Sequence, residues 1–426
     1  MSNSNRNLKR IQSSLVWRYR AEKAFRWCGV VAVALGLLAV LALFSDIIIK
    51  GKGAFFATYM QFEVTYDQEL LGIDNFADDQ QLIIADWESL YKSALRADFP
   101  DVRKRADKRK LYALVSDGTG YDLKARLLAD PKLLGQSEII WLLADDDIDT
   151  YFKTLLDGNA YTARLTDNQV EWLEQLDGTE RMRLQFNANF FNRGDSREPE
   201  QAGIKGAVIG SLLTLVLTLI LSFPIGIAAA IYLEEFAPKN RWTEFIEVNI
   251  NNLAAVPSII FGLLGLAIFI NFFHIPRSIP VIGGLVLAVM TLPTIIITSR
   301  AAITSVPPSI REAALGMGAS RNQMVLHHVL PLALPGILTG AIIGMARALG
   351  ETAPLLMIGM VAFIADIPGS FTEPATVLPV QIFLWADSPE RAFIEKTSAA
   401  IMVLLSFLIL MNISAVWLRK RLERRW

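Results

Sequence analysis

The chain has 426 residues, of which 53% are hydrophobic and 19% are charged, and its mean hydropathy is +0.37. This balance is too apolar for an ordinary soluble protein, so the distribution of the apolar residues is the first clue to its class. The formal net charge is only −1, and a single cysteine with three histidines excludes an intramolecular disulfide and any zinc-ligand set at these spacings.

The apolar residues are clustered in six runs, each close to or longer than the roughly 20 residues that cross a bilayer as a helix. The runs lie near residues 28–49, 206–233, 253–273, 281–298, 334–362 and 399–418. No convincing small-residue cleavage site follows the first run, which favours a retained anchor over a cleavable signal. The sequence therefore predicts an α-helical polytopic membrane protein with six transmembrane helices.

Both ends of the chain are basic. The first 26 residues contain seven Lys or Arg and one Glu, and the last eight contain five Lys or Arg and one Glu. By the positive-inside rule both termini are cytoplasmic, as an even number of spans requires.

A domain-sized segment of about 150 residues separates the first two apolar runs. Residues 51–202 contain 18 Lys or Arg against 28 Asp or Glu, so this segment is acidic, and the topology places it outside. Three stretches have apolar residues at helical spacing: residues 79–99, 137–156 and 167–176. A later stretch alternates as in a half-buried strand, at Met182, Leu184, Phe186, Ala188 and Phe190. We predict a small extracytoplasmic α+β domain that rests on the membrane surface or on a partner.

Within this segment, Asp145, Asp147 and Asp149 resemble the start of an EF-hand calcium loop. That loop requires Gly next and Glu at its twelfth position, where this chain has Thr150 and Leu156. The pattern therefore favours a solvated acidic patch, and no metal site is predicted.

A polar stretch, residues 301–331, interrupts the apolar runs between the fourth and fifth spans, on the cytoplasmic side. The capping-box spacing occurs twice in it, at Ser309 with Glu312 and at Ser320 with Gln323. We expect two short helices joined by a turn, the first rich in Ala and Met and suited to docking in a groove of another protein. From spacing alone, a plain amphipathic loop fits equally well.

This stretch resembles the EAA signature of the membrane subunits of ABC importers, whose helix docks on a separate ATPase subunit. The signature is matched by Glu312, Ala313, Ala314 and Gly318, which the resemblance assigns to ATPase coupling. Leu330 and Pro331 match the end of the signature. One position departs, because His328 stands where the signature has Ile.

Three further motifs are similar to those of phosphate-importer permeases. They are Val-Pro-Ser-Ile-Ile-Phe-Gly-Leu at 256–263, Leu-Pro-Thr-Ile-Ile at 292–296 and Arg-Ala-Leu-Gly-Glu-Thr-Ala-Pro-Leu-Leu at 347–356. The resemblance covers the first span and about residues 203–418. The acidic insert is larger than the first external loop of that family, so the resemblance assigns it no role.

The resemblance implies a permease subunit of the bacterial inner membrane, surrounded by lipid, that catalyses no reaction and binds no cofactor. Its implied partners are a second permease, a cytoplasmic ATPase that uses ATP and an external phosphate-binding protein, with no nucleic acid. The sequence contains no Gly-x-x-x-x-Gly-Lys-Ser/Thr motif, so this chain does not cradle nucleotide phosphates by that route.

Arg347 and Glu351 are four residues apart and are predicted to share one helix face inside the fifth span. Charges within a membrane are costly and usually face the bundle interior or a water-filled path. Arg347 and Glu351 are compatible with an internal ion pair that orients the helix. They are equally compatible with a transport path in which Arg347 binds phosphate and Glu351 weakens that binding. Three hydroxyl residues are candidates for the same path, although hydroxyls beside Pro and Gly more often satisfy backbone carbonyls: Thr294, Ser258 and Thr352.

Two other functions remain open: a permease for another oxyanion such as molybdate or phosphonate, and a membrane sensor with an external ligand-binding domain. The expected organisation is a basic N-terminus (1–27), a first transmembrane helix (28–50), the acidic insert domain (51–202), the importer domain (203–418, with its coupling loop at 301–331) and a basic C-terminus (419–426).

Overall fold

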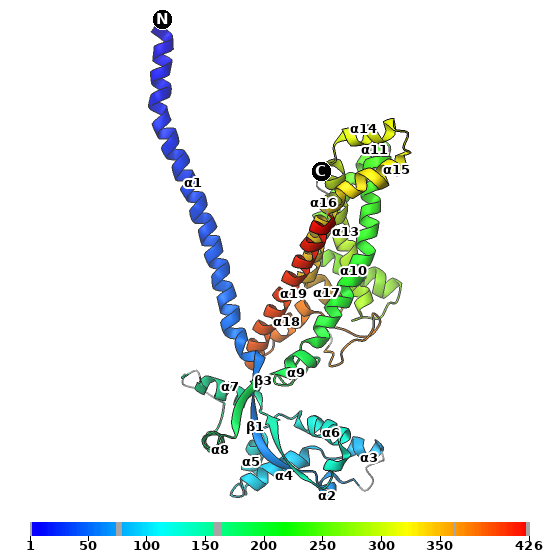
Figure 1. Cartoon of the computed structure of the whole chain (residues 1–426). Coiled ribbons are helices and arrows are strands. Elements are labelled where there is room, and N and C mark those ends of the chain that lie inside the picture. Colours follow the sequence, from blue (N-terminus) through cyan, green and yellow to red (C-terminus); the bar gives the residue numbers. More distant parts are fainter. Residues whose placement is uncertain (1, 74–78, 157, 159–163, 362, 423–426) are drawn as a thin grey trace. The chain divides into compact units, whose positions relative to one another are not determined.

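A computed structural model of the chain describes residues 2–73, 79–156, 158, 164–361 and 363–422 (Figure 1). The chain divides into two units, residues 1–50 and 51–426. Helix α1 (Ser2–Gly51) forms the first unit and ends at the first residue of the second, so it is longer than the predicted span of 28–50. Two groups of predicted basic positions lie outside what is described: the side chains of Arg6, Lys9 and Arg10, and the residues after Leu422.

The insert domain, residues 51–202, is built on a three-stranded antiparallel sheet in the order β2-β1-β3. The strands are β1 (Phe56–Thr65), β2 (Ser137–Leu143) and β3 (Met182–Phe186). On β1 the side chains of Met60, Phe62 and Val64 are fully buried, as the two-residue period of a strand requires for one face on a core. The register places Met60 beside both Leu142 and Met182.

Short helices surround the sheet and complete this core, which confirms an α+β domain between the first helix and the later spans. They are α2 (Gln68–Leu71), α3 (Asp79–Ile84), α4 (Glu88–Asp98), α5 (Arg105–Tyr112), α6 (Thr119–Ala129), α7 (Asp146–Leu156), α8 (Asp167–Gly178) and α9 (Ala188–Asn192), with 3-10 turns η1 (Lys52–Phe55) and η2 (Pro131–Leu133).

Three local predictions for this domain were wrong in part, and one held. The helix predicted over 137–156 begins with strand β2, because its β-branched and aromatic residues pair with β1. The helix predicted over 79–99 is interrupted between α3 and α4, where the Asp86 carboxylate accepts a hydrogen bond from the Ser89 N–H. The predicted strand stops at Phe186, because the Asn187 side chain caps α9. The helix at 167–176 is present as α8.

The rest of the second unit is helical. Its segments are α10 (Lys205–Ile231), η3 (Tyr232–Phe236), α11 (Arg241–Ala254), α12 (Ser258–Gly265), η4 (Leu266–Phe272), α13 (Pro280–Thr304), α14 (Pro308–Gly316), α15 (Arg321–Gln323), η5 (Met324–Val329), α16 (Leu330–Gly350), α17 (Ala353–Met357), α18 (Leu378–Ala386) and α19 (Ala392–Leu422), of which η3, η4 and η5 are π-helical. Within the described residues, five helices are long and apolar enough to cross a membrane, and a bent pair raises the number to as many as six.

The prediction of one straight third span over residues 253–273 was wrong, because this region is part of the bent helix pair. Helix α11 and the segment from Ser258 to Phe272 meet at an angle of 101° instead of forming one straight helix. The break falls at Val256-Pro257, because proline lacks an N–H and drives the preceding residue out of the helical region. Ser258 therefore opens a new helix.

The predicted fifth span, residues 334–362, is wrong at both ends. The helical segment starts earlier, at Arg321, and stops at Gly350, where Glu351 adopts an extended ψ of 118°. Pro354 then occupies the first turn of α17. Ala362, the predicted end, lies outside the described residues.

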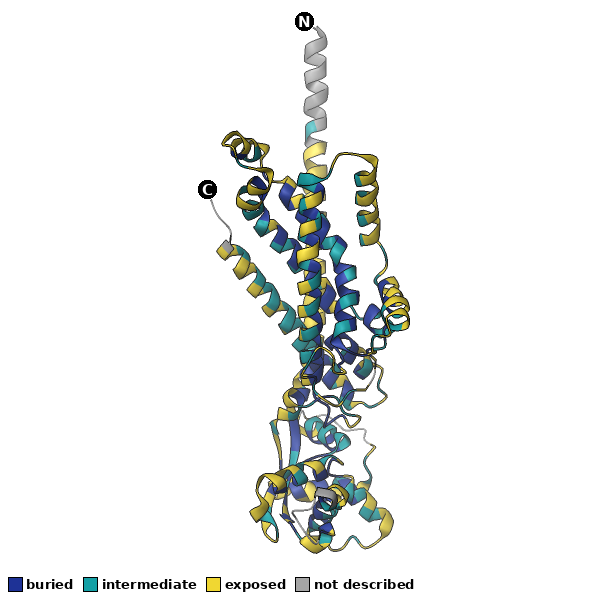
Figure 2. Ribbon diagram, turned by 90° about the vertical axis from the view of Figure 1, so that its right-hand side faces the viewer, coloured by how far each residue is buried: buried dark blue, intermediate teal, exposed yellow. Residues whose placement is uncertain are grey.

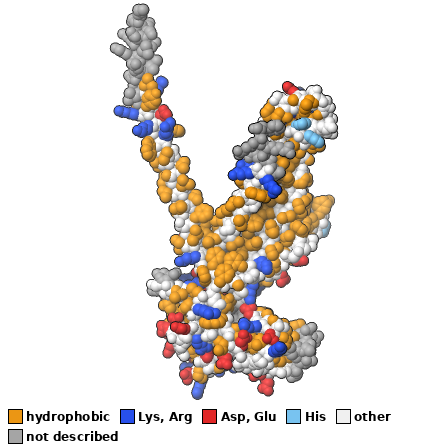
Figure 3. Space-filling model, viewed as in Figure 1, with side chains coloured by type: hydrophobic (Ala, Val, Ile, Leu, Met, Phe, Trp, Pro, Cys, Tyr) orange, Lys and Arg blue, Asp and Glu red, His pale blue; other side chains and the backbone are white. Residues whose placement is uncertain are grey.

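Helices α10, α13 and α16 form the centre of the bundle, where Figure 2 shows the buried residues concentrated. Small residues let the backbones approach, as at Gly340 of α16, which faces Thr298 of α13. The outward faces carry exposed apolar side chains, including Ile220 and Ile225 of α10 and Leu410 and Ile413 of α19. Figure 3 shows this apolar surface along the helices and the charged side chains gathered on the insert domain. Such an apolar exterior is suited to lipid.

The insert domain packs on the chain's own helices, a contact that the prediction of a membrane or partner surface had omitted. Lys153 of α7 forms ion pairs with Asp149 at 2.5 Å and with Glu395 of α19 at 3.2 Å. The indole N–H of Trp385 in α18 donates to Asp195 at 2.9 Å.

The close approach of α10 to the segment before α18 predicts a large effect of Gly210→Ala. A β-carbon at residue 210 would overlap the carbonyl oxygen of Thr376, a backbone atom that cannot rotate away. Overpacking of this kind costs about 1–3 kcal/mol, so we expect a lower melting temperature in detergent. Gly178→Ala is the matched control, because a β-carbon at Gly178 meets nothing within 4 Å. Equal melting temperatures for the two variants would contradict this packing.

Candidate functional site

The polar hairpin, residues 307–329, lies at the end of the helix bundle opposite the β-sheet of the insert domain (Figure 1). Its first helix, α14, begins directly after Pro307, with Pro308 at the first helical position. Proline is favoured there because the N–H it lacks has no partner within the helix. The turn after α14 uses Gly318 at φ +87°, a conformation that favours glycine.

One of the two predicted capping boxes is present. Ser320 and Gln323 exchange hydrogen bonds in both directions, at 2.9 and 3.3 Å. The box predicted at Ser309 is wrong, because α14 starts at Pro308 and Ser309 lies inside the helix. The second helix is also longer than predicted, since α15 continues through η5 into α16. Movement of the hairpin's second arm would therefore move α16 directly.

The three residues of the Glu-Ala-Ala motif do not face the same way. Ala314 is 1% exposed and packs with the buried residues at the ends of α13 and α16. Glu312 and Ala313 are exposed, and Met317 beyond them is 78% exposed. The hairpin thus rests on Ala314 and presents an acidic and apolar surface. The departing residue, His328, is half-buried in η5.

Arg311 binds the hairpin to the end of α10, a role that the sequence analysis did not assign. Its guanidinium donates to one carboxylate oxygen of Glu235 at 2.8 and 3.0 Å. It also donates to the carbonyls of Val306 at 2.6 Å and Ile303 at 2.9 Å, at the end of α13. Arg311 therefore joins α13, α14 and η3.

Arg300 of α13 makes a second junction at the same end. It pairs with Glu234 of η3 at 2.6 Å and with Glu247 of α11 at 2.9 Å. A sequence signal for both junctions exists in the adjacent acids Glu234 and Glu235, which directly follow an apolar run. The predicted topology places them on the same side of the membrane as Arg300 and Arg311, so pairing could have been predicted.

The proposed path residues lie farther along the bundle, on α12, α13, α16 and α17. Arg347 is in the last turn of α16 and Glu351 directly follows the helix, with Arg347 Nε 3.4 Å from Glu351 Oε1. The pair therefore closes a helix end, which differs from the predicted position inside a continuous span. The Arg347 side chain is 46% exposed, so the guanidinium is accessible in the single chain.

The three hydroxyl residues occupy the beginnings or middle of neighbouring helices. Ser258 begins α12, Thr352 precedes α17 and Thr294 follows the internal Pro293 of α13, and all three are half-buried. The helices that carry them share one apolar cluster with α16. Within the described residues, no hydrogen bond joins these hydroxyls to Arg347 or Glu351.

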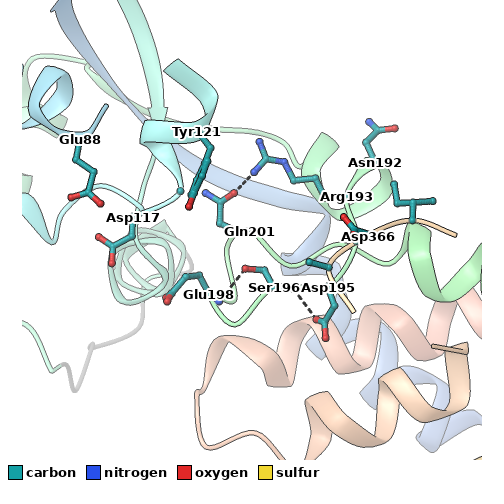
Figure 4. Close-up of a pocket in the computed structure, with 14 residues that line it drawn as sticks. Glu88, Asp117, Tyr121, Asn192, Arg193, Asp195, Ser196, Glu198, Gln201 and Asp366 are labelled. Carbon is teal, nitrogen blue, oxygen red and sulfur yellow. Dashed lines mark hydrogen bonds between the residues drawn. The ribbon is translucent and has the colours of Figure 1, made fainter. Parts of the chain in front are cut away.

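A polar cavity of about 630 Å³ lies where the insert domain meets the helical region (Figure 4). Its charged lining residues are mainly acidic: Glu88, Asp117, Asp195, Glu198 and Asp366 against Arg193. Arg193 already pairs with Asp122 and donates to Gln201. Burial, reinforced by Asp117, raises the pKa of Glu198 above its usual range. A cavity with this charge repels oxyanions.

Comparison with known proteins agrees with this architecture. Residues 222–426 match the family described as "Binding-protein-dependent transport system inner membrane component", and residues 12–161 match a domain of unknown function (DUF3333). The protein named "Probable ABC transporter permease protein YqgI" from Bacillus subtilis is 30% identical over 248 residues, which cover 55% of this chain and 83% of that protein. The chain belongs to the permease family of binding-protein-dependent ABC transporters.

Two relatives carry more specific names. The phosphate transport system permease PstA of Pasteurella multocida is 30% identical over 221 residues, covering 51% of this chain and 76% of the relative. PstC of the same organism is 33% identical over 227 residues, covering 47% and 69%. Among solved structures, an inward-facing MetNI methionine ABC transporter matches with 19% identity and a TM-score of 0.43 over 51% of this chain and 97% of that one.

As a permease of this family, the chain is a multi-pass inner-membrane subunit of an ABC importer, not an enzyme. Permeases of this family bind no cofactor, and the ATP is hydrolysed by a partner subunit. The family pairs such subunits with an ATPase and a binding protein. Membership in a permease family favours transport over the membrane-sensor alternative.

Proposed function

We propose that this permease forms half of the translocation path of an ATP-driven importer of inorganic phosphate. Its partners would be a permease of the PstC type, a cytoplasmic ATPase of the PstB type and an external phosphate-binding protein of the PstS type. The observation that carries the proposal is the similarity of its helical half to phosphate permeases. The Gly-Glu-Thr-Ala-Pro-Leu-Leu form at 350–356 favours the PstA type over PstC.

The proposed orientation places both termini and the polar hairpin in the cytoplasm and the insert domain outside. The basic ends of the chain favour it. In this orientation Glu312, Ala313 and Gly318 would form the exposed part of the ATPase-coupling element, and the buried Ala314 would hold that element against the bundle. Movement of the element would turn the helices between outward and inward openings.

The proposed anion path passes Arg347, with Glu351 as its counter-charge and Thr294, Ser258 and Thr352 as hydroxyl donors. A guanidinium suits phosphate oxygens because it donates from several N–H groups. The carboxylate at 3.4 Å competes for the same donors, so the anion would be held weakly and released. The acidic cavity of the insert domain lies outside this path.

The direct test is uptake of labelled phosphate in cells that lack this chain and in the same cells after it is restored. We expect uptake at low phosphate concentration only in the restored cells. If restoring the chain leaves phosphate uptake unchanged but restores uptake of labelled molybdate or phosphonate, another oxyanion is the substrate. Copurification of a stoichiometric ATPase is expected with either substrate.

Arg347→Gln should slow transport at least about tenfold, because a hydrogen bond to a charged group contributes about 1.5–3 kcal/mol. The complex with the ATPase should remain intact, since Arg347 lies away from the hairpin. Arg277→Gln, at an exposed arginine outside the proposed path, is the control. Uptake at the wild-type rate would show that the ion pair of Arg347 with Glu351 has only a structural role.

A further inference from the structure

A row of aromatic rings joins strand β3 of the insert domain to helix α19 of the bundle. Neighbouring ring centroids in the row are 5.5–6.4 Å apart, within the range of attractive aromatic contacts. The rings at the β3 end are stacked, with interplanar angles of 6° and 10°. In the order of their contacts, the residues of this aromatic row are Phe186, Phe191, Phe55, Phe190, Trp385 and Phe393.

One end of the aromatic row is buried among the helices. Phe190 is 0% exposed, Trp385 3% and Phe393 4%. These rings pack in one apolar cluster with Ala399 and Ala400 of α19. Their role is therefore to hold the insert domain on the chain's own helices.

The other end of the aromatic row is exposed. Phe186 is 60% exposed and Phe191 is 37% exposed. Phe56, the partner of Phe186 in the register of β1 with β3, is 48% exposed. Contiguous exposed apolar side chains, unlike scattered ones, mark a surface that contacts another molecule or a membrane. We call Phe56, Phe186 and Phe191 the phenyl patch.

The charged residues of α10 and α19 locate one edge of the membrane. After Lys396, α19 has no charged residue over 397–418, a run of 22 residues. At 1.5 Å per residue this run is about 33 Å long, close to the roughly 30 Å of the hydrocarbon layer. Helix α10 is likewise free of charged residues after Lys205. The ammonium of Lys396 donates to the carbonyl of Ala202 at 2.5 Å, so both lysines mark the same edge.

The phenyl patch lies close to this edge. A β-carbon on Gly51, the first residue of the insert domain, would lie 2.9 Å from the backbone nitrogen of Ala399, inside the charge-free run. Phe55 follows four residues later, packs against the same cluster as Ala399, and stacks on Phe191. Figure 1 shows β3 and α9, which contain Phe186 and Phe191, at the end of the insert domain nearest the bundle. The patch is therefore at the level of the lipid headgroups.

We propose that the phenyl patch inserts into the boundary between headgroups and acyl chains of the bilayer and holds the insert domain against the membrane. Aromatic side chains with an apolar body are favoured at this boundary, because their rings leave water there. Lys52, three residues before Phe55, is exposed and forms no ion pair in the described part of the chain. Its ammonium is available to lipid phosphate, as lysines at membrane edges are.

The size of the patch favours lipid over a partner subunit. A fully covered phenylalanine buries about 150–250 Å², so the three rings offer roughly 300 Å² at their exposures. A standard protein interface needs about 800 Å² from each partner. The surface next to the patch also suits lipid, since Ile394 in the first turn of α19 is 57% exposed and Leu410 farther along is 64% exposed. The proposal depends on the membrane class of the chain and not on the transported substrate.

The test places a nitroxide spin label on the patch in the assembled transporter, in nanodiscs of phosphatidylethanolamine and phosphatidylglycerol. Cys28 is the single cysteine, so Cys28→Ser gives a cysteine-free background. Phe186→Cys and Phe56→Cys then each accept one label. The measurement is the ratio of label collisions with oxygen to collisions with a water-soluble nickel chelate. We expect this ratio to exceed that of a water-exposed site at least about fivefold, because apolar surroundings exclude a polar chelate.

Ile139→Cys is the matched water reference. Ile139 on β2 is 64% exposed, close to the value for Phe186, and belongs to the same sheet. It pairs with Glu63, seven residues along β1 from Phe56, which is about 23 Å at 3.3 Å per residue. Leu410→Cys on α19 is the lipid reference. Copurification of the partner subunits verifies that each labelled chain is assembled.

The proposal requires ratios at residues 56 and 186 that lie nearer to that of residue 410 than to that of residue 139. Ratios equal to that of residue 139 would place the patch in water and overturn the proposal. Low collision rates with both oxygen and the chelate would also overturn it, because they would show that another protein covers the patch. These outcomes are independent of the uptake assay, so the membrane contact and the phosphate substrate are tested separately.

Discussion

Glu312→Lys is expected to release the ATPase and abolish transport while the chain stays in the membrane. Glu312 is exposed on α14, and its neighbour Ala314 fixes the helix to the bundle, so the substitution reverses a surface charge without disturbing the core. Like charges placed across an interface cost several kcal/mol. The measurement is copurification of the ATPase from membranes, together with substrate uptake.

Glu244→Lys is the matched control for this prediction. Glu244 is an exposed carboxylate in the first turn of α11, outside the polar hairpin. Charge reversal there should leave both the ATPase and transport in place. If Glu312→Lys retains the ATPase in wild-type amount, Glu312 does not belong to the docking surface.

Arg311→Met should have the second large effect, because it removes four hydrogen bonds at the junction of α13, α14 and η3. It also leaves the Glu235 side chain, which is 7% exposed, without its partner. Removal of one member of a fully buried pair costs about 3–5 kcal/mol, which is an upper bound for this partly buried pair. We expect a lower melting temperature and a loss of transport larger than the loss of assembled complex.

A double substitution separates the ion pair from the other contacts of Arg311. Glu235→Gln in the Arg311→Met background removes the buried charge and should recover part of the melting temperature. Arg321→Met, at an exposed arginine of the same hairpin, should change neither property by much. An Arg311→Met variant as stable as Arg321→Met would show that the junction contributes nothing to the fold.

Much of the local structure was predictable because short-range chemistry determines it. The turn at Gly318 and the cap at Ser320 depend on residues a few positions apart, and both are present. Errors arose where two local signals competed. Residues 137–143 carry a helical spacing of apolar residues, but pairing with β1 makes them a strand. Ser309 had a capping partner at Glu312, but Pro308 had already begun the helix.

The fifth span shows a related error. Its apolar composition continues beyond Gly350, so hydropathy predicted one long helix and placed Arg347 and Glu351 inside it. The backbone leaves the helix at Glu351 instead, shortly before Pro354. Hydropathy reports which residues avoid water, and it does not report where the hydrogen-bond ladder ends.

The sequence by itself determined the membrane class, the position of the insert and the family motifs of the hairpin, because composition, length and local spacing carry that information. Only the tertiary structure decided that Ala314 faces inward while Glu312 faces outward, since this depends on which helix ends meet there. It also decided the pairing of Arg311 with Glu235 and of Lys153 with Glu395, across 76 and 242 residues of chain. Contacts at such separations come from packing of the whole bundle, and no local pattern specifies them.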